Sequence, residues 1–242
     1  MKFLVDFELE KEIIPMDWRR CILSYLKFSL SKANGGKYFD EYYGMVKEKP
    51  FCFSVVFDHP VFSKDSIEVK GKRLRLVIST ADSKTGFILF SAIIAQKNSV
   101  FPLPMGNSMR MIRAVQMQES QVHSNKILVK MLEPLCIRKH DKDTNRDWYY
   151  SQKQKEEFEI ESKRVVRAQL LSAGFAEELC EVKFTPVNAR TIVVKFYGIN
   201  IESSLGDFML EGDKTVLNYL LKSGAGSRRS SGFGVMKLLA EE

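Results

Sequence analysis

Glycines, arginines and serines are concentrated in one short segment near the C-terminus, and this composition suits phosphate binding. Residues 224–234 read GAGSRRSSGFG and lie between an amphipathic segment and the last apolar run. Glycine lets backbone N–H groups approach a phosphate closely, and the guanidinium groups of Arg228 and Arg229 add charge and paired donors. We therefore interpret this segment as a candidate phosphate-binding loop.

Two nucleotide-binding motifs also use glycine-rich loops, but the context fits neither. A P-loop requires GxxxxGK[ST] after a strand, and the dinucleotide fingerprint GxGxxG opens a helix. Here the glycines follow a helical pattern and lead into the strand pattern at residues 235–238, so ATP and NAD are not expected as ligands. A small-molecule enzyme with such a loop would need a helix after Gly234. A glycine-rich turn without a ligand stays the simplest alternative.

The first half of the chain shows the order β, α, β, β, α, β. Hydrophobic periodicity and turn residues predict these elements. They are a strand at 2–10, a helix from Trp18 to the Asn34-Gly35-Gly36 stop, strands at 51–58, 67–70 and 73–80, a helix at 83–96 capped by Ser83, and an extended segment at 109–119.

The second half repeats this order. Its expected elements are a strand at 126–131 running on toward Arg138, a helix at about 151–172, strands at 180–186 and 190–201, a helix at 214–223 and a last strand at 235–240. This is the split βαβ order. The sequence therefore predicts an α+β protein of two tandem ferredoxin-like (RRM-like) βαββαβ domains packed side by side. The expected domains are residues 1–120 and 125–242, joined by the polar stretch 120–125 and leaving a groove between them.

Charge and cysteine usage narrow the class of protein further. The 242 residues include 37 Lys and Arg against 30 Asp and Glu, a formal charge of +7 that is typical of polyanion binders. Four scattered cysteines without a CxxC pair predict reduced core thiols, and neither a metal site nor a cofactor is expected. No signal-peptide pattern and no apolar run of ~18 residues is seen, so we expect a cytoplasmic protein without a membrane span.

The glycine-rich segment resembles the C-terminal signature of the CRISPR-associated endoribonucleases that cut repeat RNA, part of the repeat-associated RNA-binding superfamily. That signature is G-hydrophobic-G, a basic and Ser-rich spacer, and G-hydrophobic-G before the last strand. Further segments fall in the family's order and extend the resemblance over essentially the whole chain. They are Ile14-Pro15, KPFCFS at 49–54, LEPLCIR at 132–138 and FMLEG at 208–212.

The resemblance implies two ferredoxin-like folds and a specific chemistry. Members of the family cleave on the 3′ side of a nucleotide without metal, the 2′-hydroxyl of the substrate attacking the phosphate to leave a cyclic phosphate and a 5′-hydroxyl. This reaction needs a base near that hydroxyl, a proton donor for the leaving oxygen and a cation for the phosphoryl oxygens. A runner-up is a catalytically silent RNA-binding subunit of a CRISPR effector complex.

The resemblance also directs attention to residues 37–49. Many relatives carry a histidine between the first helix and the second strand, with a tyrosine on the helix and a lysine close by, and this segment has no histidine. Three explanations stay open: a histidine-free site working by positioning and charge, a proton donor elsewhere in His140, or binding without cleavage. The residues considered for the histidine-free site are Tyr42, Tyr43, Lys47, Tyr25 and Lys27. The candidate catalytic residues are Lys27, Tyr42, Tyr43 and His140.

Packing roles are the alternatives for each of these side chains. Tyr25 lies on the apolar helical face and is expected in the core, whereas Lys27 lies outside it. Tyr42 and Tyr43 suit packing equally well, and His140 lies in a charged segment that we interpret as a turn. The aromatic run at 148–150 could stack on bases or pack at a helix start.

RNA contacts are expected mainly from the glycine-rich segment. The candidate RNA-binding residues are Lys222, Gly226, Ser227, Arg228, Arg229, Ser230 and Gly232. Arg110, Arg113, Lys139, Arg164 and Arg167 could extend a basic track, although helix charges are more often only solubilising. The expected partners are CRISPR repeat RNA and other subunits of a CRISPR effector complex, with the chain a monomer or weak homodimer.

Overall fold

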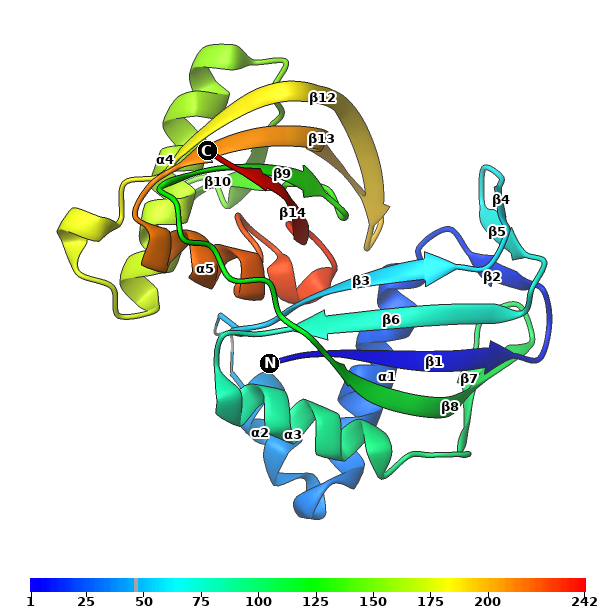
Figure 1. The fold of residues 1–242 in the computed structure, drawn as a ribbon. Helices are drawn as coiled ribbons and strands as arrows, with labels where there is room; N and C mark the ends of the chain where they lie inside the picture. The colour runs from blue at the N-terminus through cyan, green and yellow to red at the C-terminus, as the bar shows by residue number, and fades with distance from the viewer. Residues whose placement is uncertain (46–47) are drawn as a thin grey trace. The chain divides into compact units, whose positions relative to one another are not determined.

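The computed structural model describes residues 1–45 and 48–242, and these divide into two compact units. The first unit comprises Met1–Gln118 with Lys195–Gly198, and the second comprises Glu119–Val194 with Ile199–Glu242. Each unit contains one principal antiparallel sheet with helices packed against it (Figure 1).

The first unit has a five-stranded sheet in the order β3-β6-β1-β8-β7 and a small sheet in the order β2-β5-β4. Without β7, the large sheet has the strand order of the ferredoxin-like fold. Its elements are β1 (Lys2–Leu9), β2 (Ile13–Pro15), α1 (Trp18–Lys32), α2 (Lys37–Tyr43), β3 (Cys52–Phe57), β4 (Pro60–Phe62), β5 (Ser66–Val69), β6 (Arg73–Ser79), α3 (Ser83–Ile94), β7 (Val100–Leu103) and β8 (Asn107–Met117).

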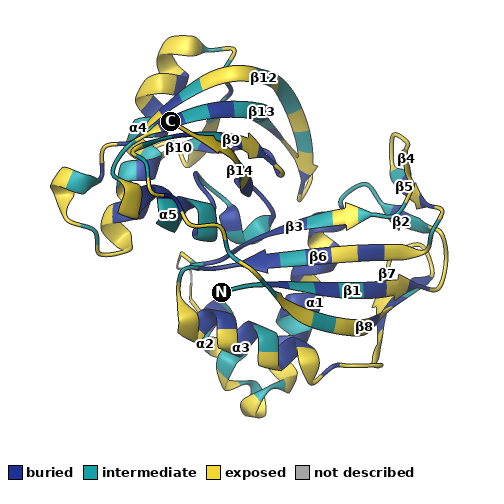
Figure 2. Ribbon diagram, viewed as in Figure 1, coloured by how far each residue is buried: buried dark blue, intermediate teal, exposed yellow. Residues whose placement is uncertain are grey.

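Alternation along β1 separates the two faces of this sheet. Phe3, Val5, Phe7 and Leu9 are no more than 2% exposed and face α1 and α3. Phe7 makes an edge contact with Tyr25 of α1, with 4.9 Å between the ring centroids. Phe3 makes the matching contact with Phe90 of α3 at 5.1 Å. The other face carries Leu4 and the polar side chains of Asp6 and Glu8. Figure 2 shows the residues of each strand coloured by how far they are buried. The period of two predicted from the sequence is confirmed.

The second unit has a four-stranded sheet in the order β12-β13-β9-β14 and a separate ribbon of β10 and β11. Its elements are β9 (Lys126–Met131), β10 (Ile137–Asp141), β11 (Arg146–Tyr150), α4 (Lys155–Ser172), β12 (Lys183–Phe196), β13 (Ile199–Glu211), α5 (Lys214–Ser223) and β14 (Met236–Glu241). Alternate residues of β9 pack with Val166 and Leu170 of α4 and Leu217 of α5 in one buried core. The predicted α+β class and the two ferredoxin-like folds are confirmed.

Several local predictions were wrong. The strand expected at 190–201 does not exist as such, because β12 runs continuously to Phe196 and the chain turns at Tyr197 and Gly198 before β13. The residue that caps α3 is Asp82, not Ser83, and its side chain accepts bonds from the N–H groups of Lys84 and Thr85. The short helix α2 was not foreseen.

The predictions for residues 132–154 also need correction. The strand β9 ends at Met131, and the chain then forms the β10–β11 ribbon, so His140 lies in a strand and not in a turn. Trp148 lies in β11 and does not begin a helix, because α4 starts only at Lys155. The turn of the ribbon is shaped by Asp141, whose side chain accepts bonds from Asp143 N–H and from the N–H and hydroxyl of Thr144.

Candidate nucleic-acid interface

The glycine-rich loop leaves α5 and packs tightly against the segment before β10. Gly226 has φ +83°, and a Cβ there would lie 2.7 Å from the Cys136 carbonyl oxygen. Gly234 has φ +68°, and a Cβ there would lie 1.9 Å from the Ala225 carbonyl oxygen. Only glycine fits both positions, since each needs a left-handed backbone and has no room for a side chain.

Hydrogen bonds to acceptors within the second unit occupy many of the backbone N–H groups of the loop. Gly226 N–H donates to Gln169 Oε1 (3.1 Å), Ser227 N–H to the Cys136 carbonyl (2.8 Å) and Gly234 N–H to the Pro134 carbonyl (2.8 Å). These glycines therefore fix the path of the loop, and contact with phosphate would fall mainly to side chains. The predicted RNA contacts of Gly226 and Gly232, both buried, stay predictions.

The two loop arginines differ in their surroundings. Arg229 is 4% exposed, and its Nη1 donates to the Ser223 carbonyl at the end of α5 (3.0 Å). Burial lowers the pKa of this guanidinium to about 10. A side chain this buried has little surface left for a phosphate, so its contact with RNA stays a prediction and its evident role is to hold the loop. Among the neighbours, Ser227 and Ser230 are half-buried, and Lys222 pairs with Glu119 at 3.2 Å.

Arg228 instead reaches toward the β10–β11 ribbon. Its backbone has φ +60°, a left-handed conformation that costs a non-glycine residue about 1 kcal/mol and often marks a functional position. Its Nη2 donates to Tyr149 Oη at 2.9 Å and to Asp147 Oδ2 at 3.4 Å, and its side chain stays 23% exposed. The loop thus presents one accessible arginine.

The face of the ribbon that meets Arg228 carries four polar side chains in two cross-strand pairs, His140 opposite Asp147 and Arg138 opposite Tyr149. His140 Nδ1 lies 2.9 Å from Asp147 Oδ1, while Arg138 Nη1 (3.2 Å) and Tyr149 Oη (3.1 Å) donate to Oδ2 of the same carboxylate. We call Arg138, His140, Asp147, Tyr149 and Arg228 the ribbon cluster.

Asp147 is the centre of the ribbon cluster. Burial by itself would raise the pKa of Asp147, but the bond with His140 and the charge of Arg138 outweigh it and hold that pKa below its usual range. The group is therefore a carboxylate at neutral pH and can only accept hydrogen bonds. It follows that the His140 nitrogen facing it, Nδ1, carries a hydrogen.

In the first unit, a second group gathers around Tyr43 at the end of α2. Lys27 Nζ of α1 lies 5.1 Å from the centroid of the Tyr43 ring, and Lys49 Nζ lies 4.8 Å from it. The hydroxyl of Tyr43 is buried and has no hydrogen-bond partner among the described residues, and burial raises its pKa. We call Lys27, Tyr43 and Lys49 the tyrosine–lysine group.

The other tyrosines of this region hold the fold together. Tyr42 is 4% exposed, its Oη lies 2.7 Å from Thr85 Oγ1 at the start of α3, and burial raises its pKa. Tyr25 is 1% exposed and packs on Phe7 and Phe101, which agrees with the core role expected for it. Lys47, the other member of the expected histidine-free site, lies outside the described residues.

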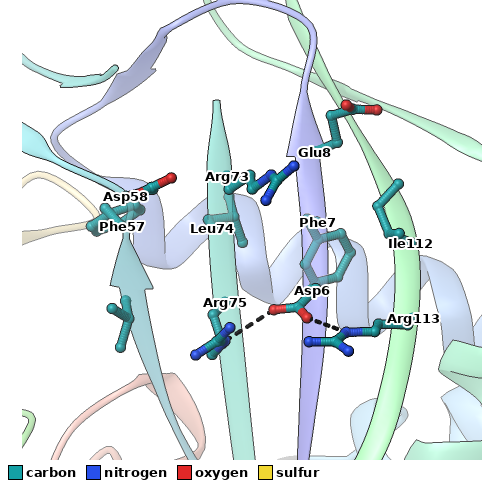
Figure 3. Close-up of a pocket in the computed structure, with 11 residues that line it drawn as sticks. Asp6, Phe7, Glu8, Phe57, Asp58, Arg73, Leu74, Arg75, Ile112 and Arg113 are labelled. Atoms are coloured by element: carbon teal, nitrogen blue, oxygen red, sulfur yellow. Dashed lines mark hydrogen bonds and ion pairs between the residues drawn. The ribbon is translucent and has the colours of Figure 1, made fainter. Parts of the chain in front are cut away.

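The polar face of the first sheet is hollowed into a pocket of about 460 Å³. Asp6 lies between two arginines, accepting from Arg75 Nε at 3.0 Å and from Arg113 Nε at 2.6 Å (Figure 3). Burial opposes ionisation of Asp6, yet these two arginines hold its pKa below the usual range. Arg73 also lines this pocket. The pocket is thus rich in guanidinium groups but largely neutralised by acids.

The basic track expected along the chain is balanced by acidic neighbours. Arg110 pairs with Glu8, Arg113 with Asp6, Lys139 and Arg164 both with Glu161, and Arg167 with Glu177 and Glu181. Salt bridges on a surface contribute little stability and can open for a polyanion. An RNA track through these residues stays a prediction.

The remaining features of the described residues are the cysteines, possible metal ligands and the helices. The four cysteines are free and buried, as expected. Residues 1–45 and 48–242 contain no group of three His, Cys, Asp or Glu side chains placed to hold a metal ion. No helix in this part of the chain is long and apolar enough to cross a membrane.

Sequence reasoning brought Lys27 together with Tyr43 and named His140 and Arg228, but it missed their partners. Lys49 was not singled out, although it closes the segment that lacks a histidine. Arg138 and Asp147 were missed, and Tyr149 was considered only for base stacking or packing, because residues 137–150 were not recognised as a hairpin. The one available signal was the Asp- and Asn-containing turn at 141–145, because the flanking residues show no apolar alternation.

Comparisons with known proteins agree with this architecture. Residues 117–238, just over half of the chain, match the family model described as "CRISPR associated protein Cas6, C-terminal". A sequence comparison with curated proteins found no match.

Solved structures match over the full length. A structure described as "An RAMP protein binding different RNA substrates" superposes with a TM-score of 0.84 at 15% identity, covering 99% of this chain and 100% of that one. One described as "Characterization of a Cas6-related gene from Pyrococcus furiosus" gives 0.84 at 15%, covering 100% and 99%. A third, "Cas6 (TTHB231) product complex", gives 0.70 at 15%, covering 98% and 99%. At this identity the likeness establishes the fold.

Two ferredoxin-like units, the second ending in a glycine-rich loop before its last strand, place this chain among proteins with a tandem ferredoxin-like fold. Within this class the chain belongs to the Cas6 family of CRISPR-associated proteins. The resemblance noted in the sequence is thereby confirmed.

Proposed function

We propose that this protein is a metal-independent endoribonuclease that cuts CRISPR repeat RNA into guide units. Its family supports binding or processing of such RNA. The observation that carries the proposal is Arg228: the glycine-rich loop holds it in a left-handed conformation and presents its guanidinium, still partly exposed, beside the side chains of the ribbon. A phosphate bound there would meet cations and polar groups suited to phosphoryl chemistry.

The proposed reaction uses a nucleophile that belongs to the substrate. The RNA 2′-hydroxyl attacks the adjacent phosphorus, so the O2′–P bond forms and the P–O5′ bond breaks, leaving a 2′,3′-cyclic phosphate and a 5′-hydroxyl. One proton leaves O2′ and one is delivered to O5′. Because no metal-bound water has to be generated, cationic side chains can supply the charge stabilisation. Lys27 and Lys49 of the tyrosine–lysine group are candidates for that role.

A second candidate function is an RNA-binding subunit of a CRISPR effector complex that holds RNA without cutting it. The observation that favours it is the absence of histidine from residues 37–49 together with the raised pKa values of Tyr42 and Tyr43. Both phenols stay protonated at neutral pH, so neither accepts the 2′-hydroxyl proton as a base.

Cleavage in EDTA distinguishes the two functions. Purified protein is incubated with repeat RNA from its own locus and with the same RNA carrying one 2′-deoxy nucleotide at the cut site. The nuclease proposal expects a cyclic phosphate end from the first RNA and no product from the second. Tight binding of both RNAs without cleavage of either would contradict it and establish the silent binder.

A further inference from the structure

The ribbon cluster contains an imidazole–carboxylate pair, an arrangement in which the carboxylate orients a histidine for proton transfer. His140 Nδ1 faces an ionised Asp147 at 2.9 Å, and the carboxylate fixes this nitrogen as the one that carries hydrogen. The opposite ring nitrogen, Nε2, is then the one that gains and loses a proton. The His140 side chain is 39% exposed, so a substrate can reach it.

The rest of the ribbon cluster supplies what a phosphodiester needs around such a nitrogen. Arg138 and Arg228 contact the Asp147 carboxylate from different segments of the unit, and the Tyr149 hydroxyl links the carboxylate to Arg228. Two guanidinium groups and one phenol are therefore within one hydrogen bond of the acid that orients His140. This arrangement combines phosphate-binding cations with a proton donor.

We propose that His140 is the general acid of an RNA phosphodiester site on the second unit, with Asp147 as its positioning residue and Arg138 and Arg228 as its phosphate-binding cations. The proposal rests on the proposed function.

As O2′ bonds to phosphorus and its proton passes to solvent water, the electron pair of the breaking P–O5′ bond goes to O5′. Protonated His140 delivers the Nε2 proton to O5′, and Asp147 stabilises the imidazolium before the transfer. Solvent then reprotonates the neutral imidazole.

A leaving group that needs no proton tests the assignment directly. Single-turnover cleavage in EDTA is measured on repeat RNA with an ordinary O5′ at the cut site and on RNA with a bridging 5′-sulfur there, which leaves as a thiolate. His140→Ala and His140→Gln should slow the oxygen substrate about 100-fold or more and leave the sulfur substrate within a few-fold of the wild-type rate. Asp147→Asn should show the same pattern with a smaller loss.

Matched variants separate this role from general damage. His123→Ala removes a histidine outside the cluster, and Asp143→Asn removes a carboxylate of the same ribbon that does not contact His140; both should cut both substrates normally. Equal loss on the two substrates in His140→Gln would overturn the acid assignment, because a structural defect does not distinguish oxygen from sulfur. An unchanged rate would overturn it as well.

Histidine NMR distinguishes failure of this site from failure of the nuclease function. The chain has three histidines, His59, His123 and His140, so labelled imidazoles are readily resolved. Adding 2′-deoxy repeat RNA should shift the His140 signals and leave those of His59 and His123 in place. No shift while the RNA binds would overturn the site. A shift with no cleavage by wild-type protein would leave a phosphate-binding cluster and overturn both the acid role and the nuclease function.

Discussion

The tyrosine–lysine group of the first unit and the ribbon cluster of the second differ in the chemistry they can perform. In the first, two ammonium groups flank a phenol whose pKa is raised by burial. In the second, an imidazole faces a carboxylate whose pKa is lowered by its bonds and neighbouring cations. The tyrosine–lysine group offers ammonium groups that can stabilise negative charge, and the ribbon cluster offers an imidazole that can transfer a proton.

A chain without a histidine at the family's usual position can therefore still carry a side chain suited to proton transfer elsewhere. Duplication of the fold gives the chain two sheets, each with loops and strand ends that can carry reactive side chains. Charge stabilisation and proton transfer are separable contributions to phosphoryl chemistry. We expect the tyrosine–lysine group to contribute charge stabilisation and the ribbon cluster to contribute proton transfer.

Removing both lysines of the tyrosine–lysine group should have the largest effect on cleavage among the variants outside the ribbon cluster. Lys27→Ala with Lys49→Ala should slow single-turnover cleavage about 100-fold, as losing charge stabilisation at a transition state commonly does. The loss should be equal for the oxygen and sulfur substrates, in contrast to His140 variants. Lys32→Ala, on the same helix α1, is the control. A loss confined to the oxygen substrate would refute the division of roles.

The two loop arginines provide the next test. Arg228→Ala should weaken RNA binding and lower the slope of log Kd against log salt by about 1. Arg229→Ala should instead destabilise the second unit by about 2 kcal/mol, since it leaves the buried Ser223 carbonyl without its donor. Salt-dependent binding and denaturant unfolding of the single variants measure these effects. A change in salt slope in Arg229→Ala alone would reverse the assignment.

Replacing Tyr42 or Tyr43 of α2 by phenylalanine should change the free energy of unfolding in different ways. Tyr42→Phe loses the hydrogen bond to Thr85 and should lower the free energy of unfolding by about 1 kcal/mol. Tyr43→Phe removes a buried hydroxyl that has no partner among the described residues, so it should be neutral or stabilising. If Tyr43→Phe also slows cleavage, its hydroxyl is retained for function; if it destabilises the fold like Tyr42→Phe, the contrast fails.

The smallest effect is on acid stability. The pKa of Asp147 is lower in the folded chain than its ordinary value of 3.8, so its contribution is present above about pH 4 and is lost as the pH falls through the folded value. Asp147→Asn should therefore flatten the part of the acid-unfolding curve below about pH 4, measured by circular dichroism. Asp143→Asn should leave that part unchanged.

Elements with a regular apolar pattern were predictable, because burial of one face determines both period and type. The alternation of β1 and the helical spacing of α1 are such cases, and each lies close to its predicted bounds. The strands β12 and β13 were harder to read, because many residues of β12 are exposed and the apolar pattern runs through the turn at Tyr197 without marking it. Here backbone pairing with neighbouring strands, not side-chain burial, sets the bounds.

The candidate site was predictable by residue type but not by partnership. The composition of the loop pointed to Arg228, yet the burial of Arg229 depends on the end of α5 and leaves no trace in the sequence. His140 was named without Asp147, because their contact is made across a ribbon of short polar strands that lacks an apolar alternation. Contacts across strands need a register, which hydrophobicity alone does not provide there.

The bonds of Gln169 have a consequence for how this family can vary in length. Its side-chain amide donates to the Gly224 carbonyl and accepts from Gly226 N–H. The position of the loop therefore depends on the direction in which α4 points the Gln169 side chain. Deleting one residue of α4 ahead of Gln169 would turn that amide by about 100° around the helix axis and release both bonds. Insertions or deletions should therefore be tolerated beyond the end of α4, while the length of the helix before Gln169 is fixed by the loop it positions.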